Sequence, residues 1–126
     1  MLETAHAELS ASSAHRWIAC PASVSESRGL PNKTSQAAEE GTAAHELAEF
    51  CLRNGTNPKD EIGKSFNGFV VDEEMADAIK RYLDFCRALP QGRSHVEQRL
   101  DFSLWVPKGF GTADFVSIKE GEAWVV

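Results

Sequence analysis

A histidine and an aspartate stand out as residues with chemistry beyond what an ordinary fold needs. His45 lies beside glutamates in EEGTAAHELAEFCLRNG, and Asp114 lies between Ala113 and Phe115 in FGTADFVSI. Carboxylate oxygens are ligands that Mg²⁺ prefers, and an imidazole nitrogen favours Mn²⁺ over Ca²⁺. An unpaired carboxylate among apolar neighbours would be costly. From these residues alone, a surface histidine and an aspartate at a turn or strand edge also remain open.

Helices are predicted to position the histidine. The pattern predicts helices over Ser13–Cys20, Gln36–Asn54 and Glu73–Leu89. Residues that favour helix ends stand at these boundaries: Ser12 or Ser13, Pro21, Ser35, Gly55, Asp72 and Pro90. PASVSESRGLPNKTS and GTNPKDEIGKSFNGF are predicted to be loops because they are rich in Ser, Pro, Gly and Asn.

Small side chains predict that the middle helix packs closely against a neighbour. Small or apolar residues fall near one face of this helix: Ala37, Gly41, Ala44, Leu47, Ala48 and Cys51. Glycine inside a helix costs about 1 kcal/mol relative to alanine. We therefore expect Gly41 and Ala44 to be buried against a neighbouring backbone.

Strands are predicted to position the aspartate. SHVEQRLDFSLWV, FGTADFVSI and EAWVV predict a three-stranded meander with turns at 107–109 and 120–121. The order of helices followed by a meander predicts an α+β fold in a single domain, 1–126, helical over 10–90 and a β-meander over 93–126. The face of the sheet on which Asp114 lies stays open.

Composition excludes several classes of protein. The chain has 126 residues, a net charge of −6 and three cysteines, Cys20, Cys51 and Cys86. This charge argues against a protein that coats DNA, although a metal-dependent nuclease site is itself acidic. We expect a cytosolic protein with free thiols, with neither a membrane span nor a secretory signal.

Three segments, in this order, are similar to one family of nucleases: LSASSAHRWIACPAS, EEGTAAHELAE and VEQRLDFSLWVPKGFGTADFVSI. They resemble the N-terminal half of phage and prophage RecB-like nucleases of the PD-(D/E)XK superfamily. The resemblance covers nearly the whole chain. It implies an incomplete restriction-endonuclease-like core, with N-terminal helices packed on an antiparallel meander.

The resemblance also implies the site residues. The family's Gly-Ser/Thr-x-x-His motif matches Gly41 to His45, and its Gly-x-x-Asp motif matches Gly111 to Asp114. His45 and Asp114 are therefore expected to be catalytic and to bind the metal ion. Glu97 resembles an acid that precedes the aspartate motif in related nucleases, which makes it a candidate accessory ligand.

Glu49 and Cys20 raise two further questions about the site. Glu49 lies one helical turn after His45, so it either orients the imidazole or belongs to a solvated helix face, the commoner case.

Some RecB-like nucleases carry an iron–sulfur cluster. None is expected here, because the three later cysteines that would follow Cys20 after the nuclease core are lacking.

The activity that the resemblance implies is metal-dependent hydrolysis of DNA phosphodiester bonds, with Mg²⁺ or Mn²⁺ as the cofactor. We expect exonuclease-like cleavage, while endonuclease action and strand preference stay open. The family's Asp/Glu-x-Lys motif would come after EAWVV, where this sequence stops. We therefore expect a truncated form that binds the ion weakly and does not cut DNA at a useful rate.

A binding protein that keeps the nuclease fold without catalysis is the alternative. It would act on a host or phage protein, and the open edge of the last strand could pair with that partner. DNA would be the partner of the intact nuclease. The resemblance implies the cytoplasm of a bacterial host and a phage or prophage gene.

Overall fold

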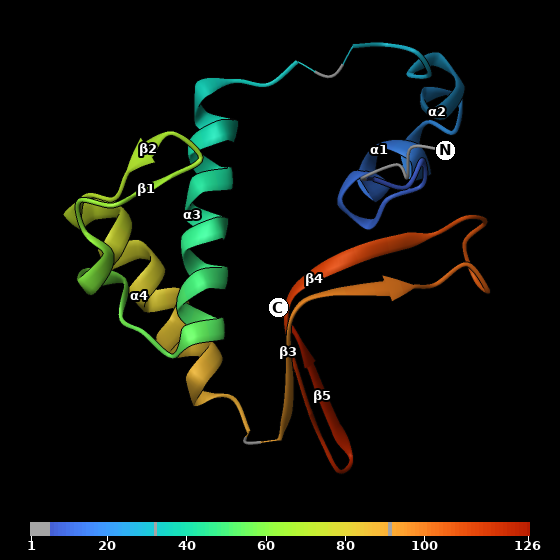
Figure 1. The fold of residues 1–126 in the computed structure, drawn as a ribbon. Coiled ribbons are helices and arrows are strands. Elements are labelled where there is room, and N and C mark those ends of the chain that lie inside the picture. Colours follow the sequence, from blue (N-terminus) through green and yellow to red (C-terminus); the bar gives the residue numbers. More distant parts are fainter. Residues whose placement is uncertain (1–5, 32, 91) are drawn as a thin grey trace. The chain divides into compact units, whose positions relative to one another are not determined.

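The computed structural model describes residues 6–31, 33–90 and 92–126 and confirms an α+β fold (Figure 1). The helices are α1 (Ala14–Ala19), α2 (Ala22–Glu26), α3 (Gln36–Asn54) and α4 (Glu73–Ala88), and the strands are β1 (Ser65–Phe66), β2 (Phe69–Val70), β3 (Arg93–Asp101), β4 (Phe110–Lys119) and β5 (Glu122–Val125). Short 3₁₀ helices cover Ala11–Ser13 and Pro58–Glu61. Among the described residues, no helix is long and apolar enough to cross a membrane.

The chain divides into two compact units, and strands β3 and β4 run through both. One unit contains Met1–Asn32 and Gln98–Ala113, and the other contains Lys33–Glu97 and Asp114–Val126. We call them the N-terminal unit and the helix–sheet unit. The expectation of a single domain stays a prediction.

Helix α3 begins and ends where its sequence predicts. The Ser35 hydroxyl accepts a hydrogen bond from the Ala38 amide at 3.1 Å, which satisfies one of the free N–H groups at the helix start. Gly55 follows the last turn with a φ of 66°, a left-handed conformation that glycine adopts without a steric penalty. Both capping predictions are therefore confirmed.

Helix α4 begins as predicted and ends one residue early. The Asp72 carboxylate accepts from the Met75 amide at 2.8 Å. Leu89 is extended, with a ψ of 156°, because Pro90 disfavours a helical conformation in the residue before it. Helices α3 and α4 pack around a core of Leu47, Cys51, Val71, Ala76 and Leu83.

The predicted close packing of Gly41 and Ala44 is wrong. Ala43 is the buried residue of that turn, while Gly41 and Ala44 are only partly buried. A side-chain carbon added at Gly41 would meet nothing within 4 Å, so no neighbouring backbone requires a glycine there. The second half of the stripe, Leu47, Ala48 and Cys51, is buried, whereas its first half is not.

Two segments predicted as loops contain regular structure. Ala22–Glu26 forms α2, and the segment after α3 contains the small hairpin of β1 and β2. Asn67 and Gly68 join these strands with φ angles of 48° and 80°, as a type I′ turn requires. The Asn67 amide also donates to the Glu39 carbonyl at 2.9 Å, which holds the hairpin on α3. Short elements fixed by such contacts are hard to predict from composition.

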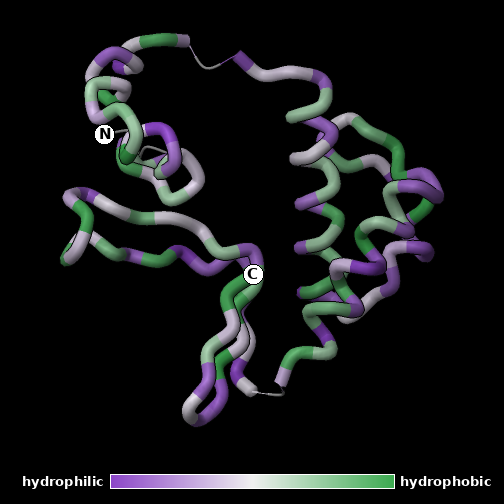
Figure 2. The backbone as a smooth tube through the Cα atoms, turned by 180° about the vertical axis from the view of Figure 1, so that it is seen from behind, coloured by the Kyte–Doolittle hydropathy of each residue, from purple (hydrophilic) through white to green (hydrophobic). Residues whose placement is uncertain are grey.

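The predicted meander is confirmed, with strand order β3-β4-β5. Strands β4 and β5 are antiparallel, with Val116 opposite Val125 and Lys119 opposite Glu122. Figure 2 shows their hydrophilic turn between more hydrophobic strands. Phe115 joins the sheet to the end of α4 through a buried cluster with Cys86 and Leu89.

The N-terminal unit contains α1, α2 and the outer half of the β3–β4 hairpin. The Trp17 indole donates to the Ser10 carbonyl at 2.9 Å, which holds α1 against the chain before it. In the hairpin, the Arg99 guanidinium stacks 4.1 Å from the centre of the Phe110 ring.

Candidate metal centre

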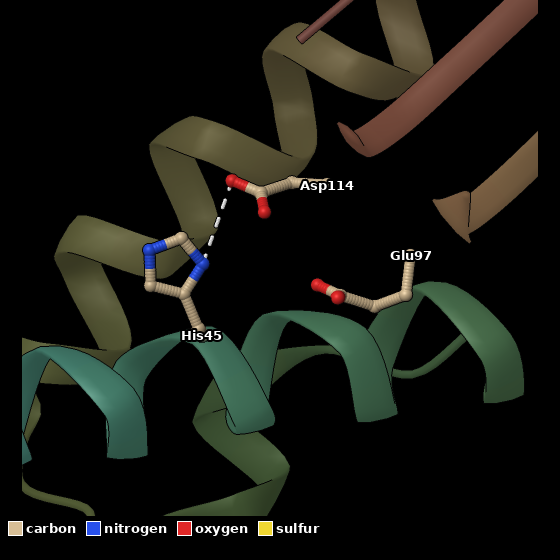
Figure 3. Close-up of side chains that lie close together, drawn as sticks. All are labelled: His45, Glu97 and Asp114. Atoms are coloured by element: carbon tan, nitrogen blue, oxygen red, sulfur yellow. Dashed lines mark ion pairs between the residues drawn. The ribbon is translucent and has the colours of Figure 1, made fainter. Parts of the chain in front are cut away.

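Side chains from α3, β3 and β4 converge within the helix–sheet unit. The Nδ1 atom of His45 lies 3.5 Å from Oδ2 of Asp114. A ligand atom from each of His45, Glu97 and Asp114 lies within 4.8 Å of the others. Figure 3 shows the imidazole rising from α3 toward the Asp114 carboxylate, with the Glu97 carboxylate beside them. The structure therefore brings together the three residues that the sequence selects as ligands.

His45 lies on α3 next to the buried face of the helix. Its neighbours Ala43, Leu47 and Ala48 are buried, whereas the His45 side chain is 63% exposed. The helix therefore presents the imidazole beside the core rather than within it. A ligand or substrate could reach the ring from solvent.

Glu97 is placed by an unusual backbone conformation. Its φ is 53°, a left-handed value that is uncommon for any residue other than glycine. Side chains alternate between the two faces of a regular strand. Here, however, Val96 packs against the cluster at the end of α4, and the next residue, Glu97, still reaches His45. A carboxylate on a left-handed residue thus reaches the site directly after a residue that packs at the end of α4.

Asp114 is placed on β4 beside the cluster that joins the sheet to α4. Its carboxylate lies next to His45 of α3, and the following residue, Phe115, packs with Cys86 and Leu89 at the end of α4.

The surroundings of Glu97 make its ionised form unfavourable. Burial raises the pKa of Glu97, and the nearby carboxylates of Asp114 and Glu49 raise it further, while His45 and Arg53 act in the opposite direction. A cation between Glu97 and Asp114 would favour the ionised form of both.

Glu49 is part of an ion pair on the surface of α3. Its carboxylate lies 2.9 Å from the guanidinium of Arg53, which also donates to the Val96 carbonyl of β3 at 3.3 Å. Whether Glu49 also orients the imidazole of His45 stays a prediction. The pair holds α3 beside the strand that carries Glu97.

A cavity opens beside the converging side chains. Its volume is about 220 Å³, and it is lined by Ala44, His45, Ala48, Ile79, Tyr82 and Asp114. A second cavity of about 330 Å³ lies along α3 and α4 and includes Gly41. The two cavities share Ala44 and Ile79. Ala37, Gly41 and Ala44 therefore line open space, whereas Leu47 and Cys51 of the same stripe belong to the core. Gly111, the glycine of the Gly-x-x-Asp motif, lines neither of these two cavities and belongs to the N-terminal unit.

The geometry suits a divalent cation. Bonds of about 2.1 Å to an octahedral Mg²⁺ or Mn²⁺ place neighbouring ligand atoms about 3.0 Å apart and opposite ones about 4.2 Å apart. The His45–Asp114 separation of 3.5 Å falls between these values, and the limit of 4.8 Å requires only a small side-chain rotation. One imidazole and two carboxylates also match the ligand types of these ions.

Tyr82 is the residue of this region that sequence reasoning missed. It is not singled out as a site residue from the sequence, yet it lines the cavity with His45 and Asp114. One signal was present in the sequence: a tyrosine within an apolar stripe carries a hydroxyl that must find a partner when buried.

The comparison with protein families covers the whole described site. A family model with the description "Protein of unknown function (DUF2800)" matches residues 6–126, a range that includes His45, Glu97 and Asp114. No solved structure matches the chain. Because the match spans nearly its full length, the chain belongs to the DUF2800 family.

Proposed function

We propose that His45, Glu97 and Asp114 bind a divalent cation, Mg²⁺ or Mn²⁺, in a centre that hydrolyses phosphodiester bonds of DNA. The observation that supports this most is the convergence of three ligand atoms within 4.8 Å from three separate elements. DNA as the substrate, and a partial PD-(D/E)XK core as its scaffold, rest on the resemblance of the three sequence segments to RecB-like nucleases.

The conformation of Glu97 favours a metal centre over a chance cluster of charges. A left-handed backbone at a residue other than glycine costs about 1–3 kcal/mol and concentrates at functional sites. Here the Glu97 carboxylate is partly buried beside another carboxylate, and burial first, then the charge of Asp114, raises its pKa. Both effects are unfavourable without a cation, and a bound cation would offset the repulsion.

The three residues would divide the work of the site. The bound cation would polarise the phosphate and lower the pKa of a water molecule. Glu97 and Asp114 would hold the cation and offset its charge, and His45 would supply a neutral ligand on the exposed side. Because the His45 side chain is 63% exposed, a phosphate group could approach from there.

The expected rate of cleavage is low. Residues 1–126 contain no Asp-x-Lys or Glu-x-Lys sequence, so the lysine that the resemblance implies is not among them. A positive group at the reacting phosphate is typically worth about 3–4 kcal/mol. The proposal for residues 1–126 is therefore metal binding with slow cleavage.

Nuclease assays with matched variants test the proposal. Linear and circular DNA would be incubated with Mg²⁺ or Mn²⁺ and with wild type, Asp114→Asn or Asp84→Asn. Asp84 is the control because it is an exposed aspartate that pairs with Lys80 at 2.7 Å. We expect weak metal-dependent cleavage that Asp114→Asn abolishes and Asp84→Asn retains. Cleavage that survives Asp114→Asn in a highly purified preparation would refute the nuclease assignment.

The edge of the sheet favours a second candidate, a binding protein without catalysis. Strand β5 is at the edge, and all four of its residues are exposed. Such an edge can pair with a strand of another chain. A second copy is the simplest partner, and this candidate predicts self-association in the micromolar range that Val125→Pro weakens. Sedimentation as a monomer throughout that range would contradict this form of the candidate.

A further inference from the structure

Tyr82 carries a buried hydroxyl group that lacks a strong hydrogen-bond acceptor. The ring packs against the buried residues of both clusters in the helix–sheet unit. Its hydroxyl oxygen is buried and has no hydrogen-bond partner among the described oxygen and nitrogen atoms. The neighbouring thiol of Cys86 is only a weak acceptor. An unpaired buried hydroxyl costs about 1–3 kcal/mol, and a phenylalanine would fill the same space without that cost.

The charged groups of the candidate metal centre act on this hydroxyl. Tyr82 lines the same cavity as His45 and Asp114. Burial raises the pKa of Tyr82 most, and Cys86, Asp114 and Glu97 raise it further. A phenolic hydroxyl is protonated at neutral pH and can act as a donor. The carboxylates of the site are the strong acceptors in this region.

We infer that Tyr82 is a positioning residue, whose hydroxyl donates a hydrogen bond to the Asp114 carboxylate when the cation is bound. This inference rests on the metal centre proposed above. A carboxylate that binds a metal through one oxygen is usually hydrogen-bonded through the other, which fixes its orientation. The cavity of about 220 Å³ between these residues leaves Asp114 room to turn.

Tyr82→Phe removes the hydroxyl and keeps the packed ring. We expect the affinity for Mn²⁺, measured by calorimetry, to fall about tenfold or more, the usual effect of losing a hydrogen bond to a metal ligand. The metal-free variant should unfold at the same or a higher urea concentration, since it loses at most a weak hydrogen bond to the Cys86 thiol. Ile79→Val is the control, because Ile79 lines the same cavity without a polar group. Its Mn²⁺ affinity should stay within about twofold of wild type.

A spectroscopic measurement follows the hydroxyl in the intact protein. The chain has a single tyrosine, so 3-fluorotyrosine labels Tyr82 alone. Saturation with Mg²⁺, which is diamagnetic, should shift its ¹⁹F resonance in wild type and should not do so in Asp114→Asn.

The outcomes separate the inference from the proposal on which it rests. Equal Mn²⁺ affinity in wild type and Tyr82→Phe, with no ¹⁹F shift, would overturn the role of Tyr82 and leave the metal centre standing. A wild-type protein that binds no Mn²⁺ would overturn both. A tenfold loss in Tyr82→Phe alone, together with the ¹⁹F shift, supports the inference.

Discussion

Replacing Glu97 with glutamine should raise the free energy of unfolding of the metal-free protein. It should also reduce the stabilisation that Mn²⁺ gives. Glu97→Gln keeps the size of the side chain and the backbone conformation but removes the negative charge beside Asp114. If the cluster served only to stabilise the fold, the substitution would be neutral or harmful. If it is a metal centre, relief of the repulsion should make the metal-free variant more stable than wild type.

The magnitude follows from the separation of the charges. Ligand atoms of Glu97 and Asp114 lie within 4.8 Å, so two unit charges there repel by about 0.9 kcal/mol in water and about 3.5 kcal/mol at a dielectric constant of 20. The Asp114 side chain is 39% exposed, so the lower figure applies. We expect a gain of about 1 kcal/mol in the free energy of unfolding. Mn²⁺ at ten times its dissociation constant should stabilise wild type by about 1.4 kcal/mol and the variant by much less.

The sign of the pH dependence provides a further check. Because the pKa of folded Glu97 lies above its ordinary value of 4.5, the folded state binds more protons than the unfolded state in the window between them. Metal-free wild type therefore loses stability as the pH rises through that window. The free energy of unfolding of Glu97→Gln should therefore exceed that of wild type by the full amount above the folded pKa of Glu97. The difference should vanish below pH 4.5.

Urea unfolding at pH 8, with EDTA or with Mn²⁺, measures both effects. Glu49→Gln is the matched control, because it also removes a glutamate but breaks the ion pair with Arg53. That variant should lose roughly 0.5 kcal/mol or less and keep the Mn²⁺ response. The reasoning would be refuted if Glu97→Gln were less stable than wild type in EDTA and if Mn²⁺ stabilised both proteins equally.

Two further predictions concern the scaffold that holds the site. Leu47→Ala should lower the free energy of unfolding by about 3 kcal/mol, because the side chain is fully buried between α3 and α4. Gly55→Ala should cost about 1 kcal/mol, because its φ of 66° is left-handed. Urea denaturation measures both losses; an unchanged midpoint for Leu47→Ala, or a more stable Gly55→Ala, would contradict the core and the helix end described here.

The main helices and the meander were predictable because local signals determine them. Ser35, Gly55 and Asp72 are capping residues whose side chains or φ angles act within a few residues. Helix α2 and the β1–β2 hairpin were missed. The hairpin depends on the turn at Asn67 and on a contact with α3, which composition does not reveal.

The site was predictable in its residue types and not in its geometry. His45 and Asp114 were selected by motif, and the structure places them 3.5 Å apart. The direction of Glu97 depends on a left-handed backbone that no local pattern signals. The open space beside Gly41 was not predictable, because the stripe of small residues is packed only in its second half. Both properties arise from tertiary packing.

Pulsed electron paramagnetic resonance of bound Mn²⁺ tests the central claim most directly. The spectrum detects the nitrogen of a coordinated imidazole, and the chain has four histidines that can be replaced one at a time. We predict one Mn²⁺ per chain with a ¹⁴N coupling that disappears in His45→Gln and persists when His95 is replaced by glutamine. A spectrum without nitrogen coupling, or a coupling that survives His45→Gln, would contradict a metal centre built from His45, Glu97 and Asp114.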